Sequence, residues 1–319
     1  MSGTDTALEK ALSALAEGVP LSRAALQEFS DLDPASLQAV TSRWPSIPAK
    51  LKHAFLDGLH GLADDSTLVS FDDLARQLLS DPDGQVRMRA IRLLGENQDP
   101  RLPATFVKML ASDDDPETRR EAAAALGRFV ELGELEEIPE PTHHQVVDAL
   151  LAKVTGEDTV AIRRRALESL GYSSKPEVAT LIESSFRREN PDWQTSAMVA
   201  MGLSSDERWE EHVLSRLLDE NPGVRLAAVQ AAGELRLGSA RQLLFQVLEE
   251  EDESEVSSAA IWSLSQIGGE DVRIYVQGLL DLAEEDEDVE FLEEVLENLE
   301  FTDELNRFDL LSVEPDQDD

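Results

Sequence analysis

Six segments of the chain repeat one pattern of residues, at spacings of 32, 44, 31, 31 and 32 positions. An arginine marks the pattern in four of the six segments, and we take its position as the anchor: Arg87, Arg119, Arg163, Gln194, Arg225 and Ser257. Every segment has an alanine three positions after the anchor and an apolar residue seven positions after it. Recurrence at periods of roughly 20–50 residues is typical of proteins built from stacked repeats.

The columns of this pattern fit one face of an α-helix. The position before the anchor and the positions three and seven after it lie together at helical spacing, so they are predicted to form the core face. Four of the helices have a marked start, where a side-chain cap precedes a proline: Asp81-Pro82, Asp115-Pro116, Asn190-Pro191 and Asn221-Pro222. Five segments carry a glycine eight positions after the anchor, which is predicted to end the helix in the left-handed conformation: Gly95, Gly127, Gly171, Gly202 and Gly233.

A second amphipathic segment separates each anchor helix from the next, for example at 176–186 and 209–218. A pair of helices every thirty-odd residues can bury its apolar faces only by stacking on the next pair. Leucine and alanine dominate the composition and aromatic residues make up 5%, which favours helices over sheets. The sequence therefore predicts an all-α fold, a right-handed α–α superhelix.

The array has one long interval and two atypical ends. The interval of 44 contains about a dozen extra residues at 129–141, which are expected to leave the solenoid as a loop or a short helix. Residues 1–66 are predicted to be a helical cap, and 67–300 the solenoid of about six repeats with a capping helix over 289–300. Residues 301–319 are expected to be an acidic tail that is partly disordered.

The run from Asp81-Pro82 through Val86-Arg87 and Ala90 to Leu94-Gly95 resembles the HEAT-like repeats of the phycobilisome-lyase type, and the resemblance covers about residues 80–300. It implies a HEAT-like solenoid in which the anchor helices line an inner, concave surface. It also implies a ladder of arginine–aspartate pairs between repeats, which the anchor arginines would form. That ladder is expected to be interrupted at Gln194 and Ser257.

The charge of the chain excludes several classes of partner. Its net charge is −38 and its pI about 4.3, so it is expected to repel nucleic acid and anionic membrane surfaces. Acidic residues are most crowded over 250–319, which hold 25 of them and two basic residues. Cysteine is absent, no apolar stretch is long enough to span a bilayer, and Met1 to Gly18 lack the pattern of a signal peptide. These features predict a cytoplasmic protein.

No catalytic residue, cofactor site or metal site is expected. Deoxyhypusine hydroxylases resemble this architecture and hold iron through His-Glu pairs, but no histidine of this chain precedes a glutamate: His53, His60, His143, His144 and His212. The pair His143-His144 is interpreted as solvated residues at a helix start. Acidic runs such as 113–115 and 284–288 lack the pattern of a calcium loop and are interpreted as solvated turns.

Outward-facing positions two, five and nine residues after each anchor are the candidate partner-binding residues. From these columns we select eight: Arg89, Arg92, Arg128, Arg165, Tyr172, Val199, Leu203 and Trp262. The arginines would form a basic ridge that leads towards Trp262, the one tryptophan at an outward position. In the alternative interpretation the arginines pair with nearby acids and the apolar residues help packing. Trp193 falls in the core column, while Trp44 and Trp209 fit either a core or a binding role.

These observations predict a non-catalytic, monomeric scaffold that binds a protein or peptide partner through its concave face. The partner would be an extended peptide or a helix carrying acidic and apolar residues. The alternative function is that of an accessory protein or chaperone of the bilin-lyase type, acting on a tetrapyrrole-carrying protein, which the resemblance alone suggests. A third class, a HEAT-like DNA-repair glycosylase, is excluded by the charge.

Overall fold

A computed structural model of the chain describes residues 3–312, with side chains over 6–305, and every regular element in this range is a helix. The predicted all-α fold is confirmed. The helices form two compact units, Met1–Leu170 and Gly171–Asp319. The predicted boundaries at 66 and 300, which followed the repeat pattern, stay a prediction.

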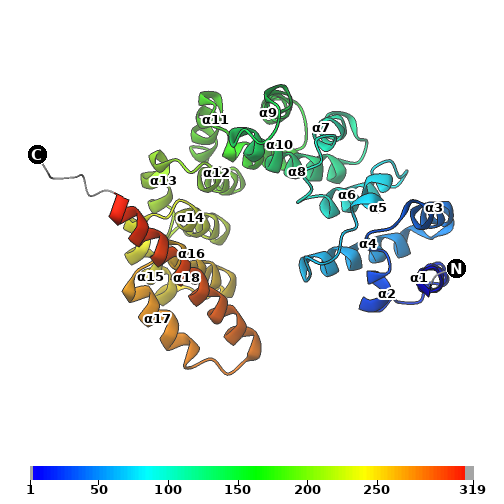
Figure 1. Cartoon of the computed structure of the whole chain (residues 1–319). Helices are drawn as coiled ribbons and strands as arrows, with labels where there is room; N and C mark the ends of the chain where they lie inside the picture. The colour runs from blue at the N-terminus through cyan, green and yellow to red at the C-terminus, as the bar shows by residue number, and fades with distance from the viewer. Residues whose placement is uncertain (1–2, 313–319) are drawn as a thin grey trace, which may run out of the picture. The chain divides into compact units, whose positions relative to one another are not determined.

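The first unit stacks its helices in two layers (Figure 1). It begins with α1 (Gly3–Glu17), α2 (Arg23–Gln27), α3 (Pro34–Arg43), the 3-10 turn η1 (Trp44–Ser46) and α4 (Ala49–Asp64). The repeats follow as α5 (Asp72–Leu78), α6 (Gly84–Leu93), α7 (Leu102–Ser112), α8 (Pro116–Glu134), α9 (Glu140–Thr155) and α10 (Val160–Ser169). Helices α4, α6, α8 and α10 pack in sequence as one layer, and α5, α7 and α9 cover them as the other.

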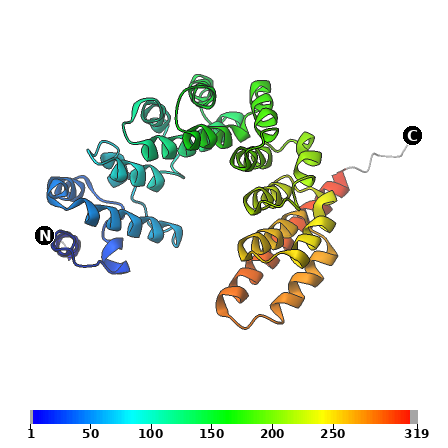
Figure 2. The ribbon, with the colours of Figure 1, turned by 180° about the vertical axis from the view of Figure 1, so that it is seen from behind.

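The second unit continues the same alternation. It contains α11 (Pro176–Phe186), α12 (Pro191–Leu203), α13 (Glu210–Leu214), α14 (Pro222–Glu234), α15 (Arg241–Glu250), α16 (Ser254–Ile267), α17 (Glu270–Leu280) and α18 (Asp286–Ser312). Short 3-10 turns lie at η2 (Leu170–Tyr172), η3 (Glu207–Trp209) and η4 (Gly238–Ala240). Figures 1 and 2 show α12, α14 and α16 side by side as one layer. Helices α13, α15 and α17 form the second layer, and α18 packs against α16 and α17.

The core columns predicted from the repeat are buried throughout. The six alanines three positions after the anchor are all fully buried, and the residues one before and seven after it are at most 5% exposed. Trp193 lies in this core as predicted, and Trp44 and Trp209 are buried as well. The pattern therefore identified the face on which each repeat stacks.

Three of the four predicted helix starts are observed. The side chains of Asp115, Asn190 and Asn221 accept backbone N–H groups in the first turns of α8, α12 and α14. The first repeat differs, because α6 begins at Gly84 and its cap is Asp83, which accepts the N–H of Gln85 at 2.9 Å. Asp81 is instead buried, and its carboxylate accepts the N–H of Asp83 at 2.8 Å.

The glycine column has a different role from the predicted one. None of these five glycines adopts a positive φ, and α12 and α14 end after their glycines. The glycines instead allow close approach: a Cβ on Gly171 would lie 2.8 Å from the Ala200 carbonyl oxygen, and one on Gly233 would lie 2.8 Å from the Ser263 Cα. In two repeats the left-handed residue comes three positions after the glycine, at Ser205 and Arg236, and the Arg236 N–H donates to the carbonyl of Gly233.

The extra residues at 129–141 do not leave the solenoid, which corrects that expectation. They lengthen α8 to Glu134 and begin α9 at Glu140, and 135–139 form the turn between the two helices. Phe129, Val130 and Leu132 are at most 1% exposed, so the added helical turns are part of the core. A helix with apolar side chains along one face must bury that face against another element, and the longer pair of helices provides that burial.

The C-terminal helix is longer than expected. The predicted capping helix at 289–300 is the centre of α18, which begins at Asp286 and continues through Ser312. Residues 313–319, the remainder of the predicted tail, lie outside the described range. In the described residues no helix is long and apolar enough to cross a membrane.

Candidate functional site

Three of the four anchor arginines join successive repeats, as predicted: Arg87, Arg119 and Arg225. The Arg87 Nη1 donates to the backbone carbonyl of Asp81 at 2.8 Å, and its Nε donates to the Asp113 carboxylate of the next repeat at 2.9 Å. Arg119 and Arg225 repeat this geometry with the carboxylates of Asp158 and Glu251. Each guanidinium therefore fixes the turn before its own helix and holds the next repeat.

The ladder of arginine–carboxylate pairs is interrupted at the fourth repeat. The Gln194 amide still donates to the carbonyl six positions before it, that of Arg188, at 2.8 Å. The carboxylate column is broken there too, because Arg188 stands where the other repeats have an acid, and its guanidinium lies 4.1 Å from the centre of the Trp193 ring. The interruption predicted at Gln194 thus has a structural counterpart.

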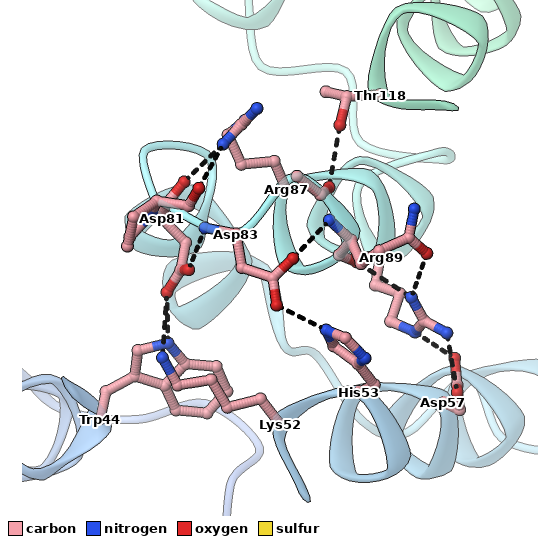
Figure 3. Close-up of polar contacts among 12 residues, drawn as sticks. Trp44, Lys52, His53, Asp57, Asp81, Asp83, Arg87, Arg89 and Thr118 are labelled. Atoms are coloured by element: carbon pink, nitrogen blue, oxygen red, sulfur yellow. Dashed lines mark hydrogen bonds and ion pairs between the residues drawn. The ribbon is translucent and has the colours of Figure 1, made fainter. Parts of the chain in front are cut away.

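The N-terminal helices contact the first repeat through side chains other than arginine (Figure 3). The buried Asp81 carboxylate accepts the Trp44 Nε1–H at 2.7 Å and lies 3.5 Å from the Lys52 Nζ. The Lys52 Nζ also lies 5.1 Å from the centre of the Trp44 ring, and His53 contacts Asp83 at 2.7 Å. These contacts give Trp44 a packing role and tie the helical cap to the first repeat.

The four outward arginines of the predicted site all have carboxylate partners. Arg89 donates to Asp57 at 2.7 Å (Figure 3), and Arg92 pairs with Glu121 at 3.1 Å. Arg128 pairs with Glu131 at 2.6 Å, and Arg165 with Glu168 at 2.9 Å. Neighbouring acids thus neutralise the positive charge of each arginine. All four belong to the first unit, so the ridge leading to Trp262 stays a prediction.

Val199, Leu203 and Trp262, three apolar residues of the predicted site, line one groove in the second unit. It holds about 460 Å³ and is formed by α12, α14 and α16, with Phe291 of α18 at one side. Val199, Leu203, Trp262 and Phe291 are half-buried, so each presents part of its apolar surface to the groove. Tyr172, the remaining predicted residue, is half-buried in η2 and is not among the lining residues.

The groove has a floor of small side chains. Ala227 and Ala231 of α14 form it and are each 2% exposed. The polar lining residues are Gln230, Glu234, Ser258, Ser263 and Gln266. All the lining residues of α12, α14 and α16 occupy or adjoin the outward columns two, five and nine positions after the anchor, so the groove lies on the same columns as the predicted site.

Phe291 is a groove residue that the repeat pattern missed. It lies 32 positions after Ala259, which is one repeat period along the column two positions after the anchor. Extending the alignment by one further repeat would have included it. The extension was hidden because α18 has neither the arginine, the alanine nor the glycine of the pattern: the equivalent columns read Asp288, Val289, Leu292, Leu296 and Glu297.

A separate cavity in the first unit carries mainly paired charges. It holds about 680 Å³ and is lined by Arg76, Asp99, Arg101 and Asp113 among others. Hydrogen bonds from the Arg101 side chain and backbone hold the pKa of Asp99 well below its usual range. Burial alone would raise the pKa of Asp113, but hydrogen bonds from Arg87 and from the backbone outweigh it and lower that pKa. These pairs belong to the ladder and the turns.

The histidines form no metal centre in the described residues, where no group of three His, Asp or Glu side chains could hold an ion. One detail of the sequence interpretation is corrected. The side chain of His143 is only 13% exposed and lies 3.6 Å from Glu134, whereas that of His144 is 54% exposed. Gly133 explains the burial of His143, because a Cβ there would lie 2.2 Å from the His143 ring.

The fold and the groove define an α-solenoid with an apolar surface on its anchor helices. The family model of HEAT repeats matches residues 71–140 and 210–300, and the chain belongs to this family. No curated protein sequence matches the chain significantly.

Several solved structures are similar in fold. Escherichia coli YibA is 16% identical, with 76% of this chain and 96% of that chain covered and a TM-score of 0.42. Kap121p bound to the SUMO protease Ulp1p is 14% identical, with 98% and 40% covered and a TM-score of 0.48. Human deoxyhypusine hydroxylase is 18% identical, with 83% and 96% covered and a TM-score of 0.34. The chain spans less than half of the karyopherin.

Proposed function

We propose that this chain is a non-catalytic protein-interaction scaffold that docks a segment of a partner protein in the groove of α12, α14 and α16. The observation that carries the proposal is the meeting of Val199, Leu203 and Trp262 at one groove with their apolar surface partly exposed. A half-buried tryptophan beside an apolar pocket is the kind of residue that anchors protein interfaces.

The composition of the groove supports binding rather than catalysis. Its lining holds one ionisable group, the Glu234 carboxylate, together with amides, hydroxyls and apolar side chains. General acid–base or nucleophilic catalysis needs a positioned pair of reactive groups, and the lining offers no such pair. Shape and apolar contact are what this surface can contribute.

Site-specific photocrosslinking tests the proposal in the native cell. A benzophenone amino acid placed at Leu203 or Gln230 should form an adduct with one discrete protein, and the same group at the exposed Glu177 of α11 should not. A peptide from the crosslinked segment should then bind the purified chain, and Trp262→Ala should weaken that binding. The same adducts from the Glu177 position, or a peptide indifferent to Trp262, would contradict the proposal.

The remaining expectations belong to this proposal as well. The cytoplasmic location, the monomeric state and the likeness to phycobilisome-lyase repeats rest on sequence alone. Sedimentation of the purified chain tests the monomer. The tetrapyrrole alternative predicts visible absorbance after incubation with a bilin, and an unchanged spectrum would count against it.

A further inference from the structure

The lining of the groove extends along each of the helices α12, α14 and α16. Val199 and Leu203 are four residues apart on α12, as are Ala227 and Ala231 on α14, so each pair lies along one side of its helix. The small floor between larger side chains leaves a trough of about 460 Å³. Because a helix presents ridges along its i, i+4 rows that fit such grooves, the trough has the shape to receive one ridge of a helix.

The length of the trough fits two turns of a helix. On α14 its lining extends from Ala227 to Glu234, about 11 Å at 1.5 Å per residue. Two turns present apolar side chains at i, i+3 or i+4, and i+7, which are the usual anchors of a helix bound in a groove.

The charged residues on the helices that line the trough are mostly acidic. Glu234 is exposed at one end of the lining and has no ion-pair partner among the residues whose side chains are described. Glu287 and Glu294 stand four before and three after Phe291, on its side of α18, and both are exposed. Glu255, also exposed, stands four before Ala259 on α16.

Basic residues are scarce on the same helices. The sequences of α12 and α16 contain none, and the one arginine of α14, Arg225, is held by Glu251. The sequence of α18 contains eleven acidic residues and one arginine. A partner with acidic flanks, as expected from the outward arginines, would meet repulsion at this groove.

We propose that the groove receives an amphipathic helix of a partner protein, in which lysine and arginine flank an apolar stripe. This inference rests on the proposed function and adds the chemistry of the partner to it. The apolar stripe contacts Val199, Leu203, Trp262 and Phe291, and the basic flanks face Glu234 and the glutamates of α16 and α18. Complementary charge of this kind sets the orientation of the helix and excludes acidic competitors.

The test is a selection from a displayed library of helical peptides with random flanks, carried out on the full-length chain. We expect the selected peptides to combine large apolar residues at i and i+4 with lysine or arginine beside them. By fluorescence anisotropy, replacing those basic residues with glutamate should lower the affinity by roughly tenfold or more. Glu234→Lys should weaken binding several-fold, while Glu177→Lys, the same charge change on α11, should leave it unchanged.

The outcomes separate this inference from the proposed function. One outcome would overturn the inference and leave the docking site in place. In it, the selected peptides lose binding to the Leu203→Asp variant, but they are not enriched in lysine or arginine, or they still bind after their basic residues are replaced with glutamate. Peptides indifferent to both Leu203→Asp and Trp262→Ala, or a selection that yields no binder, would overturn both. A circular dichroism spectrum of each variant matching that of the unaltered chain confirms that loss of binding is not loss of fold.

Discussion

Arg119 shows how one side chain can order two repeats. Its guanidinium donates to the carbonyl of Asp113 before its own helix and to the carboxylate of Asp158 after the next one, where Lys153 also donates at 2.9 Å. Burial alone would raise the pKa of Asp158, but the hydrogen bonds from Arg119 and Lys153 outweigh it and lower the pKa to about 2. The aspartate is therefore bound more strongly as an anion in the folded chain.

This shift predicts a pH dependence of stability. A carboxyl whose pKa falls from 3.8 to about 2 on folding stabilises the fold above pH 4, and the contribution is lost as the pH falls towards 2. Asp158→Asn should lower the free energy of unfolding at pH 7 by up to about 2 kcal/mol. In urea titrations the difference from the unaltered chain should shrink between pH 5 and pH 3. A constant difference would show that the charge of Asp158 is not the cause, and Glu177→Gln serves as the control.

The glycine column gives a second prediction for single residues. Gly171→Ala places a Cβ against the backbone of Ala200, at 2.8 Å and 2.9 Å, so it should destabilise the fold by about 1–3 kcal/mol. Gly278 in α17 has no atom within 4 Å of the position of a Cβ, so Gly278→Ala should be neutral or stabilise by up to about 1 kcal/mol. Thermal unfolding of both variants checks the contrast. Equal effects would mean that the glycines act through helix propensity rather than close approach.

At the scale of the helix, the sequence predicted the position of each anchor helix better than its length. The repeat columns placed the core face of every anchor helix, because burial of Ala90 and its equivalents is a requirement that each repeat shares. The extension of α8 was not predictable from that pattern, since Phe129 and Leu132 belong to one repeat alone. Whether such residues extend a helix or form a loop depends on a neighbouring helix of matching length, here α9.

The packing of the extended α8 can be measured directly. Phe129 is 1% exposed and its ring lies 6.3 Å from that of Phe106, so Phe129→Ala should destabilise the fold by about 3–5 kcal/mol. Leu135, just beyond the helix, is 59% exposed, so Leu135→Ala should change stability by less than about 0.5 kcal/mol. Chemical denaturation of the two variants compares them. A small effect of Phe129→Ala would restore the interpretation of 129–141 as an external loop.

For the whole molecule, charged residues are distributed unevenly between the two units. Gly171–Asp319 contains 37 acidic and 10 basic residues, against 29 and 18 in Met1–Leu170. The candidate site could be predicted from the sequence as far as its apolar residues, because repeated columns place them on adjacent helices. The electrostatic role of the arginines could not, since it depends on partners such as Asp57 that lie 32 positions away from Arg89.

The most direct test of the proposed docking site is to titrate a helical peptide that binds in the groove against two sets of variants of the chain. The helix comes from the photocrosslinked partner or the peptide selection, and isothermal calorimetry measures its affinity. Trp262→Ala should cost about 2 kcal/mol of binding, a loss of roughly thirtyfold, because a desolvated aromatic anchor carries much of the affinity. Combined substitution of Arg89, Arg92 and Arg165 by glutamine should change the affinity by less than about threefold, because those arginines are held by acids of their own unit. An affinity unaffected by Trp262→Ala and lost in the arginine variant would contradict the groove as the docking site.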